Sequence, residues 1–214
     1  EQKKPERIKG DVKRIEDGGS FANSGRVFTN GEWTQTVFSN GITRSFYRGL
    51  DMTVPPESSF DEYAGVRIFA GDVGTKKPLP LTPSKVIYRD TCVTFVARYK
   101  GIVFTHTTGT HPRLCGETHV LRVKNMTGHH KRVKLYVWVN PFLSDKKSGM
   151  SHPAFTKLFM TDRVYTEEKC AVVTKNDTQG GEISLCGGLL HDDDVRVLTS
   201  NTEFFRGRPF GNAG

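Results

Sequence analysis

The feature that most constrains the fold is a succession of short segments rich in β-branched and aromatic residues, separated by Gly, Pro, Asn or Asp. Such segments favour β-strands, and the residues between them favour turns. The predicted strands cover 25–29, 32–39, 42–54, 65–70, 85–99, 102–107, 117–124, 131–139, 164–174, 182–186 and 193–199. The best helix candidate is short, around 152–160, with Ser151 as an N-cap. We therefore predict an all-β fold, a single-domain antiparallel β-sandwich or jelly roll with long loops and little helix.

A chain of 214 residues fits one domain of this kind. Residues 1–19 are polar and basic, and we expect them to form a frayed or helical arm ahead of a single β domain at 20–214. The longest loops are predicted at 55–63, 71–84 and 141–152, where strand-forming residues give way to Pro, Gly and polar residues.

Two Asn-Gly pairs, at 30–31 and 40–41, are strong signals for type I′ hairpin turns. They predict a three-stranded meander over 25–46. Its predicted register places Phe28 opposite Trp33, Val37 opposite Arg44 and Ser39 opposite Ile42. The face expected to be buried carries Phe28, Trp33, Val37, Ile42 and Phe46. Phe38 falls on the other face, where burial would mean a sheet covered on both sides and exposure would favour a subunit contact.

The charge balance is basic, with 31 Lys and Arg against 23 Asp and Glu, a formal net charge of +8. Such a balance suits a polyanionic partner, although many ordinary basic proteins carry as much charge. No apolar segment is long enough for a membrane-spanning helix, so we expect no membrane partner. The chain begins with Glu1 instead of Met, which suggests a processed or trimmed product.

The segment 117–142 combines basic and aromatic residues in a strand pattern. In its second strand, four apolar residues from Val133 to Val139 alternate with Arg132, Lys134, Tyr136 and Trp138. Alternation predicts that the apolar set faces the core and that the cations and aromatic rings share the opposite face. Cations neutralise phosphates and aromatic rings stack on bases, so this face is a candidate surface for single-stranded nucleic acid. The alternative is a solvated sheet face whose Tyr136 and Trp138 pack under a loop.

The candidate nucleic-acid-binding residues are therefore the cations of the arm and the basic and aromatic residues of this segment. They are Lys3, Lys4, Arg7, Lys9, Lys13, Arg14, Arg122, Lys124, Lys131, Arg132, Lys134, Tyr136 and Trp138.

The Cys and His residues give no convincing metal site. His111, Cys115 and His119 are spaced by four, but Pro112 and Gly116 interrupt any helix there. On a strand the same spacing spans about 13 Å, which is too far for one ion. We predict no metal and no other cofactor.

Cys170 and Cys186 flank a predicted hairpin that would place them opposite each other, either reduced or as a disulfide. Catalytic signatures such as a nucleophile elbow, a phosphate-binding loop or a zinc-protease motif are absent from the sequence, so we predict no enzyme.

Three segments, KLYVWVNPF at 134–142, AFTKLF at 154–159 and DRVYTEEKCAVVTKNDTQGG at 162–181, follow one another in an order that resembles coat proteins of geminivirus-type single-stranded DNA viruses. The resemblance covers about 50 residues. It implies a jelly-roll coat protein that assembles a shell with copies of itself and packages single-stranded nucleic acid, expected to be DNA. It also implies localisation in the virion, with passage through the host nucleus during assembly. The chain departs from the family in lacking a dense Arg-rich arm and a matching Cys and His set.

The sequence therefore leaves three hypotheses for the function. The leading hypothesis is a viral capsid protein that packages nucleic acid through its basic residues. The alternative is a secreted or surface β-sandwich that binds a glycan or a host protein, with Trp33, Tyr136 or Trp138 exposed as stacking platforms. The second alternative is an enzyme on a β scaffold, for which the sequence offers no nucleophile and base.

Overall fold

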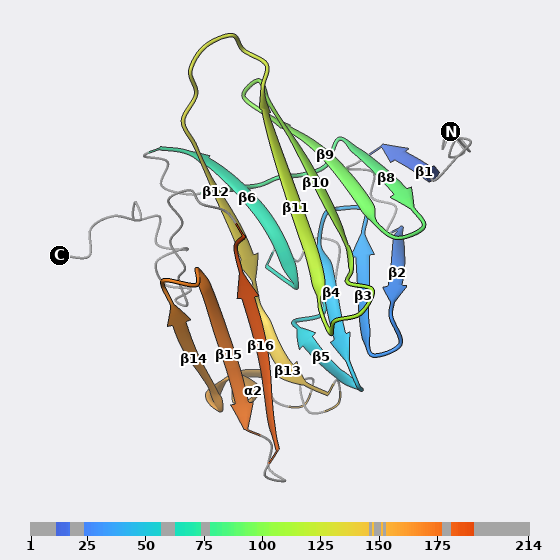
Figure 1. The fold of residues 1–214 in the computed structure, drawn as a ribbon, viewed down its shortest axis with the longest axis vertical. Helices are drawn as coiled ribbons and strands as arrows, with labels where there is room; N and C mark the ends of the chain where they lie inside the picture. The colour runs from blue at the N-terminus through green and yellow to red at the C-terminus, as the bar shows by residue number, and fades with distance from the viewer. Residues whose placement is uncertain are drawn as a thin grey trace, which may run out of the picture.

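The computed structural model describes residues 12–17, 24–56, 63–73, 78–145, 147, 151, 153–176 and 181–190. These residues form three antiparallel sheets with little helix (Figure 1). The predicted all-β sandwich is confirmed. Within the described part of the chain, no helix is long and apolar enough to cross a membrane.

Sheet A has the strand order β1-β8-β9-β10-β11. Its strands are β1 (Val12–Asp17), β8 (Lys85–Arg89), β9 (Val93–Tyr99), β10 (Ile102–Thr110) and β11 (Glu117–Asn125). Apart from β1, it is a meander in which short turns join β8 to β9 and β9 to β10, and the loop 111–116 joins β10 to β11. Residues 12–17, expected to be frayed or helical, instead pair with β8 along the edge of this sheet.

Sheet B follows the order β12-β6-β4-β3-β2, with β5, β7 and β13 attached beside this path. Its strands are β2 (Gly25–Thr29), β3 (Trp33–Phe38), β4 (Thr43–Tyr47), β5 (Leu50–Thr53), β6 (Val66–Asp72), β7 (Leu79–Pro80), β12 (Val133–Val139) and β13 (Pro141–Ser144). Sheet C contains β14 (Met160–Tyr165), β15 (Cys170–Asn176) and β16 (Glu182–Gly188), and follows the short helix α2 (Pro153–Leu158).

The core lies between sheet B and the two other sheets. Phe28 and Val37 of sheet B pack against Val86, Tyr88 and Phe95 of sheet A. A second cluster, formed by Trp33, Met52 and Leu143 of sheet B, receives Val173, Ile183 and Leu185 of sheet C. Sheet B is therefore the common layer, and sheets A and C cover different parts of it.

The meander over 25–46 forms, but its predicted register is wrong. Phe28 lies opposite Gln35, and Val37 lies opposite Thr43. Only the glycines of the two Asn-Gly pairs have positive φ, so the turns are not type I′. The Asn30 and Asn40 side chains instead accept hydrogen bonds from backbone N–H groups within each turn, which lengthens both loops.

The predicted buried face of the meander is right for β2, β3 and Ile42 but wrong for β4, where Thr43 and Ser45 point inward and Phe46 points to the other side. Phe28, Trp33, Val37 and Ile42 are buried. Phe46 and Phe38 are both half-buried. Because Phe38 is only half-buried, its exposure supports neither a sheet covered on both sides nor a subunit contact.

Several predicted strands are divided by turns that the β-propensity did not reveal. Residues 42–54 break at Arg48 and Gly49, which both have positive φ. Residues 85–99 break after Arg89, and residues 164–174 break between β14 and β15. The predicted strand 193–199 lies outside the described residues.

Cys170 and Cys186 are neighbours in sheet C but not directly opposite. The register pairs Cys170 with Gly188 and Cys186 with Val172, which shifts the hairpin by two residues from the predicted one. Both thiols are free. Burial raises the pKa of the Cys170 thiol, and Cys186 beside it raises that pKa further.

Candidate functional site

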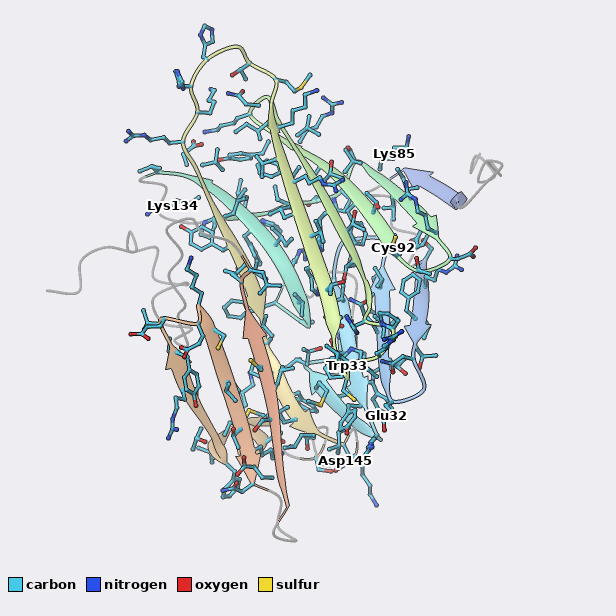
Figure 2. All side chains as sticks on the ribbon, viewed as in Figure 1. Glu32, Trp33, Lys85, Cys92, Lys134 and Asp145 are labelled. Atoms are coloured by element: carbon cyan, nitrogen blue, oxygen red, sulfur yellow. The ribbon has the colours of Figure 1, made fainter. Side chains whose placement is uncertain are left out.

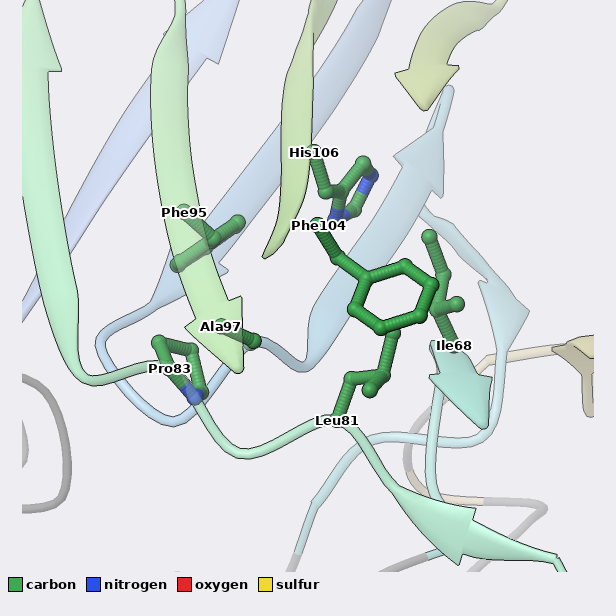
Figure 3. A pocket seen from close by; sticks show the side chains of 8 residues that line it. Ile68, Leu81, Pro83, Phe95, Ala97, Phe104 and His106 are labelled. Carbon is green, nitrogen blue, oxygen red and sulfur yellow. The ribbon is translucent and has the colours of Figure 1, made fainter. Parts of the chain in front are cut away.

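Among the described residues, the cavity found between sheets A and B is too small for a ligand larger than water. The cavity under sheet A has a volume of about 20 Å³ and is lined mainly by apolar side chains, among them Phe95, Phe104 and Ile68, with His106 at one side (Figure 3). That volume holds about one water molecule. A binding site on sheet A therefore has to lie on its outer face.

The inner face of sheet A carries a buried polar network centred on Glu117. The Glu117 Oε2 atom accepts hydrogen bonds from Ser45 Oγ at 2.8 Å and from Trp33 Nε1 at 3.4 Å. The Oε1 atom accepts hydrogen bonds from His119 Nε2 at 2.9 Å and from Thr43 Oγ1 at 3.4 Å. Both carboxylate oxygens are thus occupied by donors that tie β11 to β3 and β4.

The network continues from Glu117 through His119 to His106, whose Nε2 lies 2.9 Å from His119 Nδ1. Burial, and to a lesser degree the charge of His119, lowers the pKa of His106 to about 3. Burial alone would raise the pKa of Glu117, but the hydrogen bonds and charge of His119, with the bonds from Ser45 and Trp33, lower it overall. Glu117 is therefore ionised and His106 neutral at pH 7, and the network joins the two sheets.

The outer face of sheet A is built from the alternate residues of β8–β11. Since Phe95, Ala97, Phe104 and His106 point inward, the residues next to them along β9 and β10 point outward. One row across the sheet carries Lys124, Val103 and Arg98, and the next carries Arg122, Thr105, Val96 and Lys85. This face thus gathers cations from three strands around a β-branched surface.

Beside these two rows the outer face is lined with threonines. Arg89 Nη1 donates to Thr94 Oγ1 at 2.9 Å, and Thr94 Oγ1 lies 3.0 Å from Thr107 Oγ1. Next to them is a hollow of about 360 Å³, lined by Thr91, Cys92, Thr107, Thr108, Gly109, Thr110, Pro112, Thr118 and Val120. The hollow is therefore lined by five threonines together with apolar groups such as Pro112 and Val120.

Gly109 sets the shape of this hollow. A Cβ atom at Gly109 would lie 2.4 Å from the carbonyl oxygen of Thr91 and 3.3 Å from Cβ of Cys92. Only the absence of a side chain lets the turn between β8 and β9 approach β10 so closely.

The structure divides the predicted nucleic-acid-binding residues among different surfaces. Arg122 and Lys124 lie on the outer face of sheet A, where Arg89 and Arg98 join them although the sequence analysis missed both. The alternation within 85–89 and 93–99, together with the Lys100-Gly101 turn that sets the register of β9 and β10, was the signal that could have identified them.

The basic and aromatic face predicted for 117–142 does not form. β11 pairs with β10 in sheet A, and β12 pairs with β6 in sheet B. Lys131 and Arg132 lie in the exposed connection between these strands, and Lys134 lies on β12, on the other side of the view from Lys85 (Figure 2).

The aromatic residues of β12 lie opposite its valines, as predicted, but they follow the alternative in which they pack under a loop. Trp138 is only 8% exposed and packs with Tyr63 and Phe69, while Tyr136 is half-buried in the same cluster. Trp138 Nε1 donates to the carbonyl oxygen of Tyr63 at 3.0 Å. These rings are covered by the segment at Tyr63, so they cannot stack on a ligand. Trp33, the third predicted stacking platform, is 4% exposed.

The predicted cations of the arm cannot be assigned to a surface. Lys3, Lys4, Arg7 and Lys9 lie outside the described residues. Lys13 and Arg14 belong to β1, whose backbone pairs with β8.

The side chains considered as metal ligands have other roles. His111 Nδ1 accepts hydrogen bonds from the backbone N–H groups of Arg113 and Leu114. Cys115 Sγ donates to Glu32 Oε2, and Glu32 forms a short ion pair with Arg48. No group of three potential metal ligands occurs among the residues that the structure describes.

Similarity to known proteins changes the functional interpretation. Residues 72–209 match the family model described as "Glycosyl hydrolase 94, supersandwich domain". No curated protein matches the chain. The matched residues include β8–β11 of sheet A, β12 and β13 of sheet B and all of sheet C. Their similarity to a domain of glycosyl hydrolases means that the predicted function of a capsid protein that packages nucleic acid is wrong, and the terms capsid and virion have no support. Because the matched residues make up more than half of the sequence, the chain belongs to the family of glycosyl hydrolase 94 supersandwich domains.

Proposed function

We propose that this chain is a glycan-binding β-sandwich domain whose contact surface is the outer face of sheet A. The observation that carries the proposal is the family match over 72–209, which includes all of β8–β11. The description of that family names a domain of glycosyl hydrolases, so a carbohydrate is the ligand class that fits it best.

The chemistry of the outer face supports a carbohydrate ligand. Sugar hydroxyls both donate and accept hydrogen bonds, and so do the hydroxyls of Thr107 and Thr118 that line the hollow. Val120, which is 49% exposed, adds an apolar contact beside them. The volume of about 360 Å³ lies at the lower end of the range found for small-molecule sites.

The carboxylates of this region support binding in preference to hydrolysis. Glycoside hydrolysis commonly uses two carboxyl groups on either side of the scissile bond. Glu117 points into the core and has donors on both oxygens, and Glu32 is held by Arg48 and Cys115. Neither lines the hollow. We therefore propose a non-catalytic role.

Affinity electrophoresis through gels containing different polysaccharides tests the proposal. We expect at least one polysaccharide to retard the protein, and the double variant Thr107→Val and Thr118→Val to be retarded less. Valine keeps the shape of threonine but removes the hydroxyl. Thr161→Val, on exposed β14 of sheet C, is the matched control and should behave as the unmodified protein. Equal retardation of all three proteins would place the glycan elsewhere, and no retardation by any polysaccharide would refute glycan binding.

A further inference from the structure

We infer that the outer face of sheet A recognises an acidic polysaccharide, one that carries carboxylate groups along its chain. This inference rests on the proposed function and specifies its ligand class. It comes from the cations beside the hollow, which a neutral glycan would not need.

Three cations stand free on this face. Arg98, Arg122 and Lys124 are exposed, and none of them forms a salt bridge within the part of the chain that the structure describes. Lys85 lies on β8, at the far end of the row from Arg122. No acidic residue points outward from β8–β11. Taking the side chains that the structure describes, the field over these rows is therefore positive.

The spacing of the three cations suits a polymer with repeated charges. Arg122 and Lys124 are two residues apart on β11, which separates them by about 7 Å along the strand. Arg98 lies two strands away from Lys124 in the same row, a distance of about 10 Å across the sheet. The guanidinium groups of Arg98 and Arg122 can each bind a carboxylate with two parallel hydrogen bonds.

The threonine hollow and the cations adjoin on the same face. Thr107 and Val120 line the hollow, and Thr105 and Arg122 occupy the next row of the same two strands. A glycan chain lying along β10 and β11 would thus place hydroxyls over the threonines and carboxylates over Arg122 and Lys124. One ligand with both groups satisfies both parts of the surface.

The same face is a poor match for single-stranded nucleic acid. Binding of single strands combines cations with aromatic rings that stack on the bases. The outward-facing residues of β9–β11 include Val96, Val103, Thr105 and Val120 but no aromatic ring. The aromatic residues predicted for this role, Tyr136 and Trp138, are packed on β12.

Titration calorimetry with polygalacturonate and with its methyl ester tests the inference, because the two polymers share a backbone and differ in charge. We expect polygalacturonate to bind at least about tenfold more tightly, and more weakly as salt is raised. The double variant Arg98→Gln and Arg122→Gln should lose about tenfold or more in affinity for polygalacturonate. The control, Lys147→Gln with Arg163→Gln, removes the same charge from exposed residues away from this face and should change affinity by less than about twofold.

The outcomes separate the inference from the proposed function. Equal binding of both polymers, unaffected by the arginine variant, would overturn the acidic ligand but leave glycan binding intact. An equal loss in the two double variants would also overturn it, since only net charge would then matter. Binding of a single-stranded oligonucleotide with no binding of either polymer, or of any polysaccharide in the gels, would overturn both. Matching thermal unfolding curves would show that the variants are folded.

Discussion

Strands β11 and β12 follow one another in the chain and both alternate apolar with basic or aromatic residues, yet the fold uses them in opposite ways. β11 lies in sheet A with Arg122 and Lys124 pointing to solvent, and its inward side carries Glu117 and His119. β12 lies in sheet B with Trp138 buried outside the sandwich, while Val137, on its inward side, is 42% exposed.

The difference shows that alternation identifies the two faces of a strand but not what covers each face. On β12 the segment at Tyr63 packs on the outer face, where its ring lies 5.8 Å from Phe69 and 5.7 Å from Trp138. On β11 no segment among the described residues packs on the outer face in this way, and Arg122 and Lys124 are exposed. Whether the outer side of a strand is buried depends on a segment that is distant in sequence. The residues of the strand alone therefore do not predict it.

The largest effect should come from removing the covered ring of β12. We expect Trp138→Ala to lower the free energy of unfolding by about 3–5 kcal/mol, since it leaves a cavity and removes the edge contact with Tyr63. Urea unfolding followed by fluorescence or circular dichroism measures this.

Glycan binding under native conditions should survive Trp138→Ala, because Trp138 is not on sheet A. A change in stability below about 1 kcal/mol would mean that the ring is not packed as described.

The next effect concerns pH and the inward side of β10 and β11. The pKa of His106 is about 3 in the folded protein, below the ordinary value of 6.5, so the folded state binds fewer protons than the unfolded state. His106 therefore contributes stability that is fully present above pH 6.5 and is lost as pH falls from about 6.5 to 3, on the order of a few kcal/mol. The lowered pKa of Glu117 works in the same direction at the acidic end, below its ordinary value of 4.5.

Unfolding curves measured from pH 7 to pH 4 check this dependence. In His106→Phe, which keeps an aromatic ring in contact with Phe95 but cannot be protonated, the loss of stability between pH 6.5 and 4.5 should be much smaller. An identical pH profile in the two proteins would contradict a buried, neutral His106.

A smaller effect is expected at the hollow. Gly109→Ala should cost about 1–3 kcal/mol, because the new Cβ pushes against the backbone of Thr91, and it should weaken glycan binding by moving one wall of the hollow. Gly116→Ala is the control, since no atom lies within 4 Å of a Cβ placed there. Equal stability and affinity in the two variants would contradict this, because the turn between β8 and β9 would then move away from the new Cβ atom at no cost.

The fold class could be predicted from sequence because it depends on local signals. Strand-forming segments and turn residues gave the all-β sandwich, and the burial of Val37 and Ile42 followed from alternation. The register of the meander could not be predicted, because the Asn30 and Asn40 side chains cap their turns and lengthen the loops. The assignment of strands to sheets could not be predicted either. β11 and β12 are consecutive in sequence, yet after the connection at Lys131 and Arg132 they belong to different sheets.

The candidate site was only partly accessible from sequence. Arg122 and Lys124 were identified from their own strand, but Arg98 and Arg89 become their neighbours only through the pairing of β8–β11. The hollow depends on the close approach of Thr91 to Gly109, a contact between residues that are distant in sequence. Side chains brought together by register can be found only when the register is known.

The smallest effect on stability should come from a substitution on the inward side of β12, where Val137 is exposed. The same substitution at a buried core position provides the comparison. Thr has the shape of Val but carries a hydroxyl, so Val→Thr is costly only where the side chain is out of water. We expect Val37→Thr, at a position with 0% exposure, to lower the free energy of unfolding by about 1–3 kcal/mol.

Val137→Thr, at a position that is 42% exposed, should change the free energy of unfolding by less than about 0.5 kcal/mol. Urea unfolding of both variants at several protein concentrations measures the difference. If Val137→Thr cost as much as Val37→Thr, the inward side of β12 would be covered in solution. A cost that grew with protein concentration would then assign the cover to a second copy of the chain, because only an intermolecular contact is strengthened by mass action.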